Sequence, residues 1–226
     1  MKASLDTNVI IHLYRANLQE ILFKRFDEGL CIYEQIREIE LKNHGQDILE
    51  AFDEDVAKGR IYIYSDEELK KCGILSLFRK RVHENEMLYS PQDMGEIYAI
   101  SLAQTLGIYS LVTDDIKQGG PYMSLLQFED NDIMPFTYVD VLLLDYLEGV
   151  IEAEQVVVYF ETISDVSSLG WSLKNHLMRF IKRFWTESYQ EKEKRWMLEL
   201  CRKQGIHAKE KLKVLRDLIK NEYRNV

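Results

Sequence analysis

The sequence predicts an α/β protein in which helices cover both faces of a central parallel sheet, as a three-layer α/β/α sandwich. Two observations predict it. Short strand-like runs alternate with longer helical patterns through residues 1–150, and this alternation is typical of parallel sheets. Beyond residue 150 the strand signals fade and the remaining patterns are helical. We therefore expect a sheet domain over residues 1–150 and a helical extension over residues 151–226.

Each expected element follows from its local pattern. Apolar and β-branched runs predict strands at residues 2–5, 30–33, 60–64, 108–112 and 135–138. Helical patterns lie between and after them, at residues 8–28, 35–58, 66–82, 91–106, 116–127 and 139–149. In the extension, three further stretches favour helices: residues 152–163, 170–185 and 191–203.

The helix expected over residues 91–106 has clear boundary signals. Ser90 is a suitable N-cap, Pro91 suits the first helical position, and Gly107 marks the end. Asp93 and Glu96 lie in its opening turns, where acids also suit the helix dipole.

Composition excludes several classes of protein. Hydrophobic residues make up 46% of the chain, enough for a core, yet no apolar run approaches the roughly 20 residues of a membrane span. No signal-peptide stretch opens the sequence. The three cysteines and five histidines are scattered, which matches neither a disulfide framework nor a zinc site. We expect a soluble, cytoplasmic protein that does not contact the membrane.

The charge is unevenly distributed. The net charge is −9, which alone argues against a nucleic-acid partner. However, residues 1–169 hold 14 Lys and Arg against 31 Asp and Glu, whereas residues 170–226 hold 15 against 7. An acidic body with a basic tail suggests contact with a polyanion, although a solvated helical surface explains the tail equally well.

Carboxylates follow the predicted strands. The run KASL leads into Asp6, IYSLVT leads into Asp114 and Asp115, and LCIY leads into a helix that carries Glu40. Because ligands bind at the carboxyl ends of parallel strands, these acids and Glu96 are expected to converge there. Taken singly, each acid is better explained as a helix cap or a solvated residue, and Asp6 before Thr-Asn is a good cap.

A cluster of such acids indicates a divalent cation. Unpaired carboxylates in one crevice repel each other, and a cation between them removes that cost. An all-oxygen ligand set favours Mg²⁺ or Mn²⁺, which activate water for attack on a phosphodiester. No GxSxG, Walker or GxGxxG motif offers competing chemistry.

These motifs resemble those of the PIN-domain nucleases. SLDTNVIIHL is similar to their opening motif, IYEQIREIEL to the second, and DMGEIYAISLAQTLGIYSLVTDD to the third and fourth together. The resemblance covers about residues 1–150. Glu96 stands where many members have Asp, as in a GE-type branch, and the doubled Asp114–Asp115 leaves the fourth ligand open.

The resemblance implies a Mg²⁺- or Mn²⁺-dependent endoribonuclease that cleaves RNA. Its implied catalytic metal ligands are Asp6, Glu40, Glu96, Asp114 and Asp115, and one or two ions would bind. Asn8, Thr113 and Asp93 are expected to support the ligands by hydrogen bonding, and Asp93, one turn before Glu96, could instead share or replace the role of Glu96. The family also implies frequent homodimers and, for many small bacterial members of VapC type, a toxin held inactive by an antitoxin protein. The extension is longer than such toxins usually carry.

The extension is expected to contact RNA through four basic residues grouped near Trp171 and Trp185: Lys174, Arg179, Lys182 and Arg183. It could equally dock an acidic partner or a second copy, and for the two tryptophans a core position is favoured. Two other functions stay open. One is a catalytically inactive PIN-fold module for RNA binding or assembly, and the other is a metal-dependent phosphatase.

Overall fold

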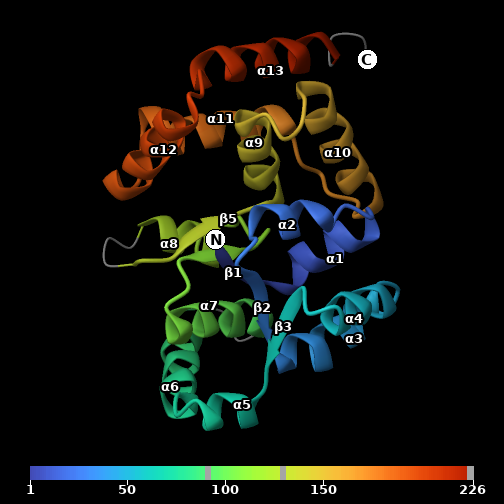
Figure 1. Ribbon diagram of the computed structural model, residues 1–226, viewed down its shortest axis with the longest axis vertical. Coiled ribbons are helices and arrows are strands. Elements are labelled where there is room, and N and C mark those ends of the chain that lie inside the picture. Colours follow the sequence, from blue (N-terminus) through green and yellow to red (C-terminus); the bar gives the residue numbers. More distant parts are fainter. Residues whose placement is uncertain (90–92, 128–130, 223–226) are drawn as a thin grey trace. The chain divides into compact units, whose positions relative to one another are not determined.

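The chain forms two compact units, Met1–Tyr138 and Val139–Val226 (Figure 1). The computed structural model describes residues 1–89, 93–127 and 131–222. The unit boundary lies earlier than the predicted one at residue 150, because nearly all of helix α9 (Tyr138–Glu148) groups with the second unit.

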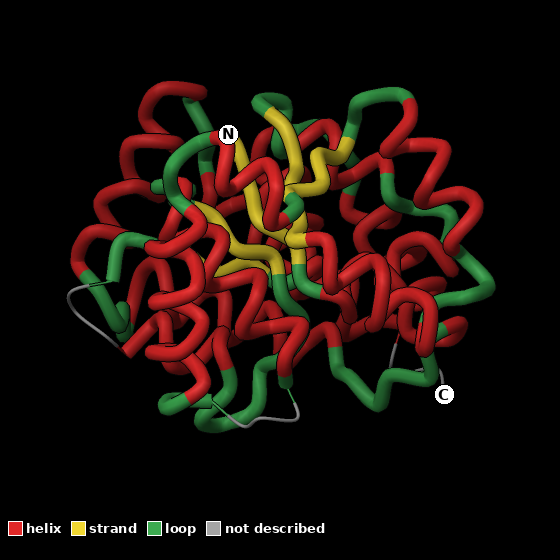
Figure 2. The backbone as a smooth tube through the Cα atoms, turned by 90° about the horizontal axis from the view of Figure 1, so that it is seen from below, coloured by secondary structure: helices red, strands yellow, loops and turns green. Residues whose placement is uncertain are grey.

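The first unit contains one five-stranded, all-parallel sheet, which confirms the predicted α/β class. Its strands lie in the order β3-β2-β1-β4-β5, side by side in Figure 2. Each observed strand overlaps a predicted one: β1 is Lys2–Leu5, β2 is Gly29–Tyr33, β3 is Ile61–Tyr64, β4 is Ser110–Val112 and β5 is Met134–Phe136.

The first unit's helices are shorter than the sequence predicts. The pattern at 8–28 divides into α1 (Thr7–Arg15) and α2 (Glu20–Arg25), because Asn17 takes a left-handed φ of 54° between them. The pattern at 66–82 divides into α5 (Asp66–Lys71) and α6 (Leu75–Glu86) at Gly73, whose φ is 73°.

Three other predicted helices also change. The pattern at 35–58 becomes a π-helical segment η1 (Ile36–Leu41), a short α3 (Lys42–His44) and α4 (Leu49–Ala57). Helix α7 is Met94–Leu106 and α8 is Pro121–Gln127. The predicted cap at Ser90 and the predicted helical start at Pro91 lie outside the described residues.

Helices cover both faces of the sheet, as the three-layer prediction requires (Figure 1). Helices α1, α2 and α4 connect β1 to β2 and β2 to β3, whereas α7 packs against β1, β2 and β4. Right-handed crossovers place these two groups on opposite faces, because the strand order reverses between them. The reversal falls between β1 and β4, which lie next to each other.

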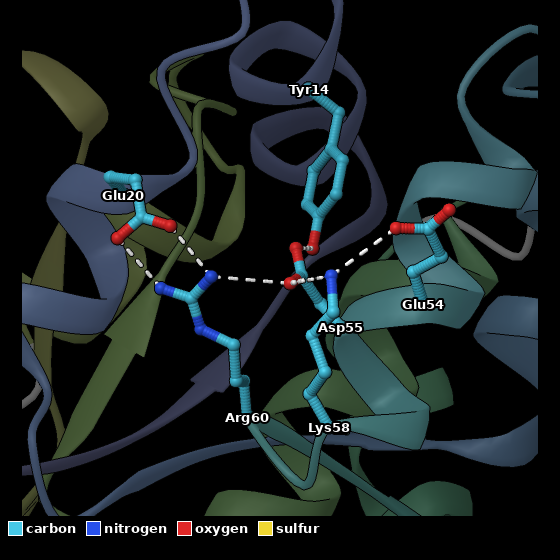
Figure 3. A network of polar contacts seen from close by, with 6 residues as sticks. All are labelled: Tyr14, Glu20, Glu54, Asp55, Lys58 and Arg60. Carbon is cyan, nitrogen blue, oxygen red and sulfur yellow. Dashed lines mark hydrogen bonds and ion pairs between the residues drawn. The ribbon is translucent and has the colours of Figure 1, made fainter.

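A polar network centred on the buried Tyr14 and Asp55 holds the first helical layer (Figure 3). The Tyr14 hydroxyl donates to Asp55 Oδ2 at 2.9 Å, and Arg60 donates to Asp55 Oδ1 at 3.2 Å and to Glu20 at 2.6 Å. The network therefore links α1, α2 and α4 at the amino end of β3, away from the strand ends that the acids follow.

The second unit is helical throughout its described part, as the sequence predicts. After α9 come α10 (Ala153–Val166), α11 (Leu173–Ile181), a π-helical segment η2 (Lys182–Thr186), α12 (Glu191–Gln204) and α13 (Ala208–Glu222). Among the described residues of both units, no helix has the length and apolar character needed to cross a membrane.

Candidate metal centre

The acids after β1 and β4 meet where the strand order reverses. Leu5 pairs with Val112 in the sheet, and the Asp6 amide donates to the Val112 carbonyl at 3.0 Å. The chain then leaves the two strands toward opposite faces, so that a crevice opens between their carboxyl ends. Asp6 and Asp115 therefore approach from neighbouring strands.

Asp6 is buried and caps α1, with 1% of its surface exposed. Its Oδ1 accepts the Thr7 amide at 2.6 Å, and its Oδ2 accepts the Thr113 hydroxyl at 3.2 Å. The pKa of Asp6 is raised to about 7, chiefly by burial and also by the charges of Asp114 and Asp115, while these two hydrogen bonds oppose the rise. The predicted cap is thus present on a carboxylate that is costly to ionise.

Glu96 is a second buried carboxylate, in the first turn of α7. Its Oε2 is buried and has no hydrogen-bond partner within the described part of the chain. The pKa of Glu96 is raised to about 10, first by burial and then by the charge of Asp6 and contact with Asp115. An orphaned, desolvated carboxylate oxygen of this kind suits a cation.

Gly95 lets α7 approach Asp6. A Cβ atom on Gly95 would lie 2.7 Å from Thr7 Oγ1 and 3.6 Å from Asp6 Oδ1, which is too close for the first contact. The same Cβ would lie 3.5 Å from Glu40 Cγ. Only glycine therefore allows the two elements to pack this closely.

Three acids offer ligand oxygens within 4.8 Å of one another: Asp93, Glu96 and Asp115. Lys117 also enters this group, because its Nζ lies 2.6 Å from Asp115 Oδ2 and 3.1 Å from Asp93 Oδ2. These contacts raise the pKa of Lys117, chiefly through the hydrogen bond to Asp115. A positive charge already lies beside two of the acids.

Asp114 and Asp115 have different partners. Asp114 Oδ2 lies 2.7 Å from His12 Nδ1, and its Oδ1 accepts the Tyr138 amide at 3.0 Å. Asp115 instead lies with Asp93 and Glu96. Of the predicted pair, Asp115 belongs to the acid cluster, whereas Asp114 contacts α1 and the Tyr138 amide within the first unit.

Glu40 and Asn8 border the same crevice. A pocket of about 280 Å³ is lined by Asp6, Thr7, Asn8, Glu40, His44, Asp93, Gly95 and Glu96. Glu40 lies in the π-helical segment η1 and is partly buried, whereas Asn8 is exposed. A π-turn shifts side-chain directions by one residue, and such turns are frequent at functional sites.

Thr113 connects two of the acids. Its hydroxyl donates to Asp6 Oδ2 and accepts the Asp115 amide, both at 3.2 Å. It therefore holds the end of β1 and the loop after β4 together. Asp93, for which the sequence left open a supporting role or a share in the role of Glu96, lies inside the cluster.

Sequence reasoning did not find Gly95, Lys117 or His12 as site residues. The glycine before Glu96 was a readable signal, since a buried helical glycine usually marks a close approach. No sequence signal marks Lys117 or His12, because their contacts with Asp115 and Asp114 depend on the conformation of the loop after β4.

The basic residues expected to bind RNA have different environments. Lys174 and Lys182 are exposed, and Arg179 is partly buried. Arg183 is fully buried in a two-bond ion pair with Glu193, at 2.6 and 2.9 Å. Its guanidinium also lies 3.6 Å from Asp140, so that Arg183 holds the second unit together and is not at a surface that RNA could reach.

The donor set fits a hard divalent cation. It consists of carboxylates without a thiol or an imidazole, and it includes the orphaned Glu96 Oε2. A bound cation would stabilise the ionised forms of Asp6 and Glu96, which burial disfavours, and would so lower their pKa values. Comparison with known proteins found no matching family model, no matching curated protein and no matching solved structure.

Proposed function

We propose that this protein is a Mg²⁺- or Mn²⁺-dependent endoribonuclease of the PIN-domain type. The observation that carries the proposal is the meeting of Asp93, Glu96 and Asp115, beside the buried Asp6, at the reversal in strand order. Ordinary helix caps do not account for it, because Glu96 has a buried oxygen without a hydrogen-bond partner in the described part of the chain.

The cation would be held by Asp93, Glu96 and Asp115, with Asp6 and Glu40 lining the pocket beside Glu96. When bound, such a cation supplies a nucleophile at neutral pH and neutralises the charge that develops on a phosphodiester. The side chains of the protein itself orient the metal ligands and bind the substrate.

Those side chains orient the ligands and receive the substrate. Thr113 keeps Asp6 and Asp115 at a fixed separation through its two hydrogen bonds. Asn8 is exposed at the pocket and can donate to a phosphate oxygen. Lys117, more than half exposed, can exchange a carboxylate partner for a phosphate as the substrate arrives.

One observation favours the non-enzymatic alternative, a PIN-fold module that binds RNA or assembles without cleaving. Lys117 already neutralises part of the charge of Asp93 and Asp115, so the cluster is partly compensated without a metal. A divalent ion would have to displace this ammonium or bind beside it. RNA as the ligand, dimerisation and a partner antitoxin stay predictions of the resemblance.

The proposal is tested by RNA cleavage in Mn²⁺. The variants Asp6→Asn and Glu96→Gln should abolish cleavage and remain folded, because each removes a carboxylate that is costly to ionise when buried. Glu50→Gln is the matched control, since Glu50 is an exposed glutamate on α4, and it should keep full activity. Activity retained by both site variants would refute the proposal.

A further inference from the structure

The second unit contains an apolar pocket with a basic rim. It has a volume of about 390 Å³, within the range of small-ligand sites. Ile181 and Leu212 contribute aliphatic surface, and Trp185 contributes a half-buried indole. The rim carries three cations: Lys209, Lys213 and Arg216.

The three cations lie on one face of α13. Their spacing of four and then three residues repeats the helical period, and Leu212 lies on the same stripe. In Figure 1, α13 runs beside α11, the helix that leads into η2, and the two helices are in contact. The basic stripe therefore faces the segment that bears Trp185, within one unit.

The charge of the pocket is not compensated by its own lining. No acid lines it among the described residues. Lys209 and Lys213 make no ion pair within the described chain, and Arg216 has one weak contact, with Nε 3.7 Å from Asp217 Oδ1. An occupant with negative charge would therefore meet three available cations.

The indole of Trp185 indicates which kind of ligand the pocket binds. The Trp185 ring packs on Phe180 and Phe184, with centroids 6.0 and 6.1 Å apart, so these rings help to fix the indole's position. A fixed indole beside several cations suits a ligand with a planar ring and a phosphate. An acidic peptide would use the cations and leave the indole without a stacking partner.

We propose that the Trp185 pocket binds one nucleotide of a single-stranded RNA, with the base stacked on Trp185 and the phosphates contacted by Lys209, Lys213 and Arg216. This inference deepens the proposed function, because it names where the substrate strand is held. Binding here needs no metal, so that it can be tested separately from cleavage. The basic residues of the second unit that contact RNA would then be Lys209, Lys213 and Arg216, and not the buried Arg183.

The test measures binding of the full-length protein to a labelled single-stranded oligonucleotide in EDTA. Trp185→Leu should weaken binding by about tenfold, since it removes the stacking face and keeps an apolar side chain. Lys213→Gln should weaken binding and reduce the slope of log affinity against log salt by about 0.7. With an oligouridylate as the labelled strand, excess uridine monophosphate should compete, because it carries the same base and phosphate.

The matched control is Lys203→Gln, which removes the same charge from an exposed lysine of α12 outside the pocket. It should leave affinity unchanged, and if Trp185→Leu does not fold, the Lys213 and Lys203 pair decides alone. Equal effects of those two variants, or competition by polyglutamate as strong as by the nucleotide, would overturn the inference. If the wild-type protein binds the oligonucleotide in EDTA but does not cleave RNA in Mn²⁺, the result counts against the proposed function alone.

Discussion

The protein holds the buried carboxylates Asp6 and Glu96 close to other acids, and the repulsion between these negative charges disfavours their ionised forms. Asp6 and Glu96 are each surrounded by protein, and burial is the main cause that raises both pKa values. The charge of Asp6 adds to the raised pKa of Glu96, whereas the charges of Asp114 and Asp115 add to that of Asp6. Two adjacent aspartates after β4 serve different purposes, because consecutive side chains in a turn point in different directions. Asp114 takes the His12 and Tyr138 contacts, which leaves Asp115 for the cluster.

This division predicts different results for the two aspartates. Asp115→Asn should weaken Mn²⁺ binding at least about tenfold, the lower bound for loss of even a supporting residue. Asp114→Asn should leave Mn²⁺ affinity nearly unchanged, because that side chain faces His12 and the Tyr138 amide. Calorimetric titration of both variants measures this, and the reverse order of effects would contradict the assignment.

The raised pKa values predict how stability depends on pH. Asp6 and Glu96 have higher pKa values folded than unfolded, so the folded state binds more protons above about pH 4. Their stabilising contribution is complete below that pH and is lost as the pH rises through about 7 for Asp6 and toward about 10 for Glu96. In metal-free protein this loss should be steeper in the wild type than in Glu96→Gln.

Urea unfolding in EDTA, followed by circular dichroism from about pH 5 to about pH 8, measures this slope. Saturating Mn²⁺ should reverse the loss, because the cation binds the ionised carboxylates of the folded state. Parallel pH profiles for the wild type and Glu96→Gln would show that Glu96 is not desolvated as described.

At the scale of elements, the site depends on how closely α7 approaches the end of β1. Gly95 allows this approach, and η1 brings Glu40 to the same pocket through a π-helical turn. The sequence could predict that helices carry these acids. The π-turn could not be predicted, because periodicity distinguishes helix from strand but not a 3.6-residue turn from a wider one.

Gly95→Ala tests this close approach. Alanine favours a helix by about 1 kcal/mol over glycine, so with free space the change would stabilise the fold. Here the added Cβ would lie 2.7 Å from Thr7 Oγ1, and we expect a loss of about 1–3 kcal/mol together with weaker Mn²⁺ binding.

Gly170→Ala is the control, because a Cβ there meets no atom within 4 Å and should cause no such loss. Chemical denaturation and Mn²⁺ titration of both variants give the comparison. A more stable Gly95→Ala protein with wild-type affinity for Mn²⁺ would show that α7 does not need this contact.

At the scale of the whole molecule, the α/β class and all five strands follow from the sequence. Strands buried on both faces have near-continuous apolar runs, and the acids at their ends stand out against them. Helix boundaries were predicted less well, because the break at Asn17 depends on a backbone conformation that no glycine or proline announces. Arg183 was predicted at the surface, because its partners Glu193 and Asp140 lie on other helices and local periodicity does not reveal such pairs.

The division into two units predicts that their stability and metal binding can be separated. Arg183→Met would leave Glu193 buried without its partner and should cost about 3–5 kcal/mol of unfolding free energy. The Mn²⁺ affinity of the protein that remains folded should not change, because every proposed ligand lies in Met1–Tyr138. Arg202→Met, at an exposed arginine of α12, should be nearly neutral. Equal effects of both variants would contradict the role of the buried pair.

The most direct test of the metal centre is calorimetric titration of the metal-free protein with Mn²⁺ at neutral pH. The site predicts saturable binding by the wild type, with release of protons from carboxyl groups whose pKa values are raised. Binding should be lost in Glu96→Gln and kept in Glu50→Gln. A silent titration of the wild type would contradict the metal centre and favour a module in which Lys117 balances the acids.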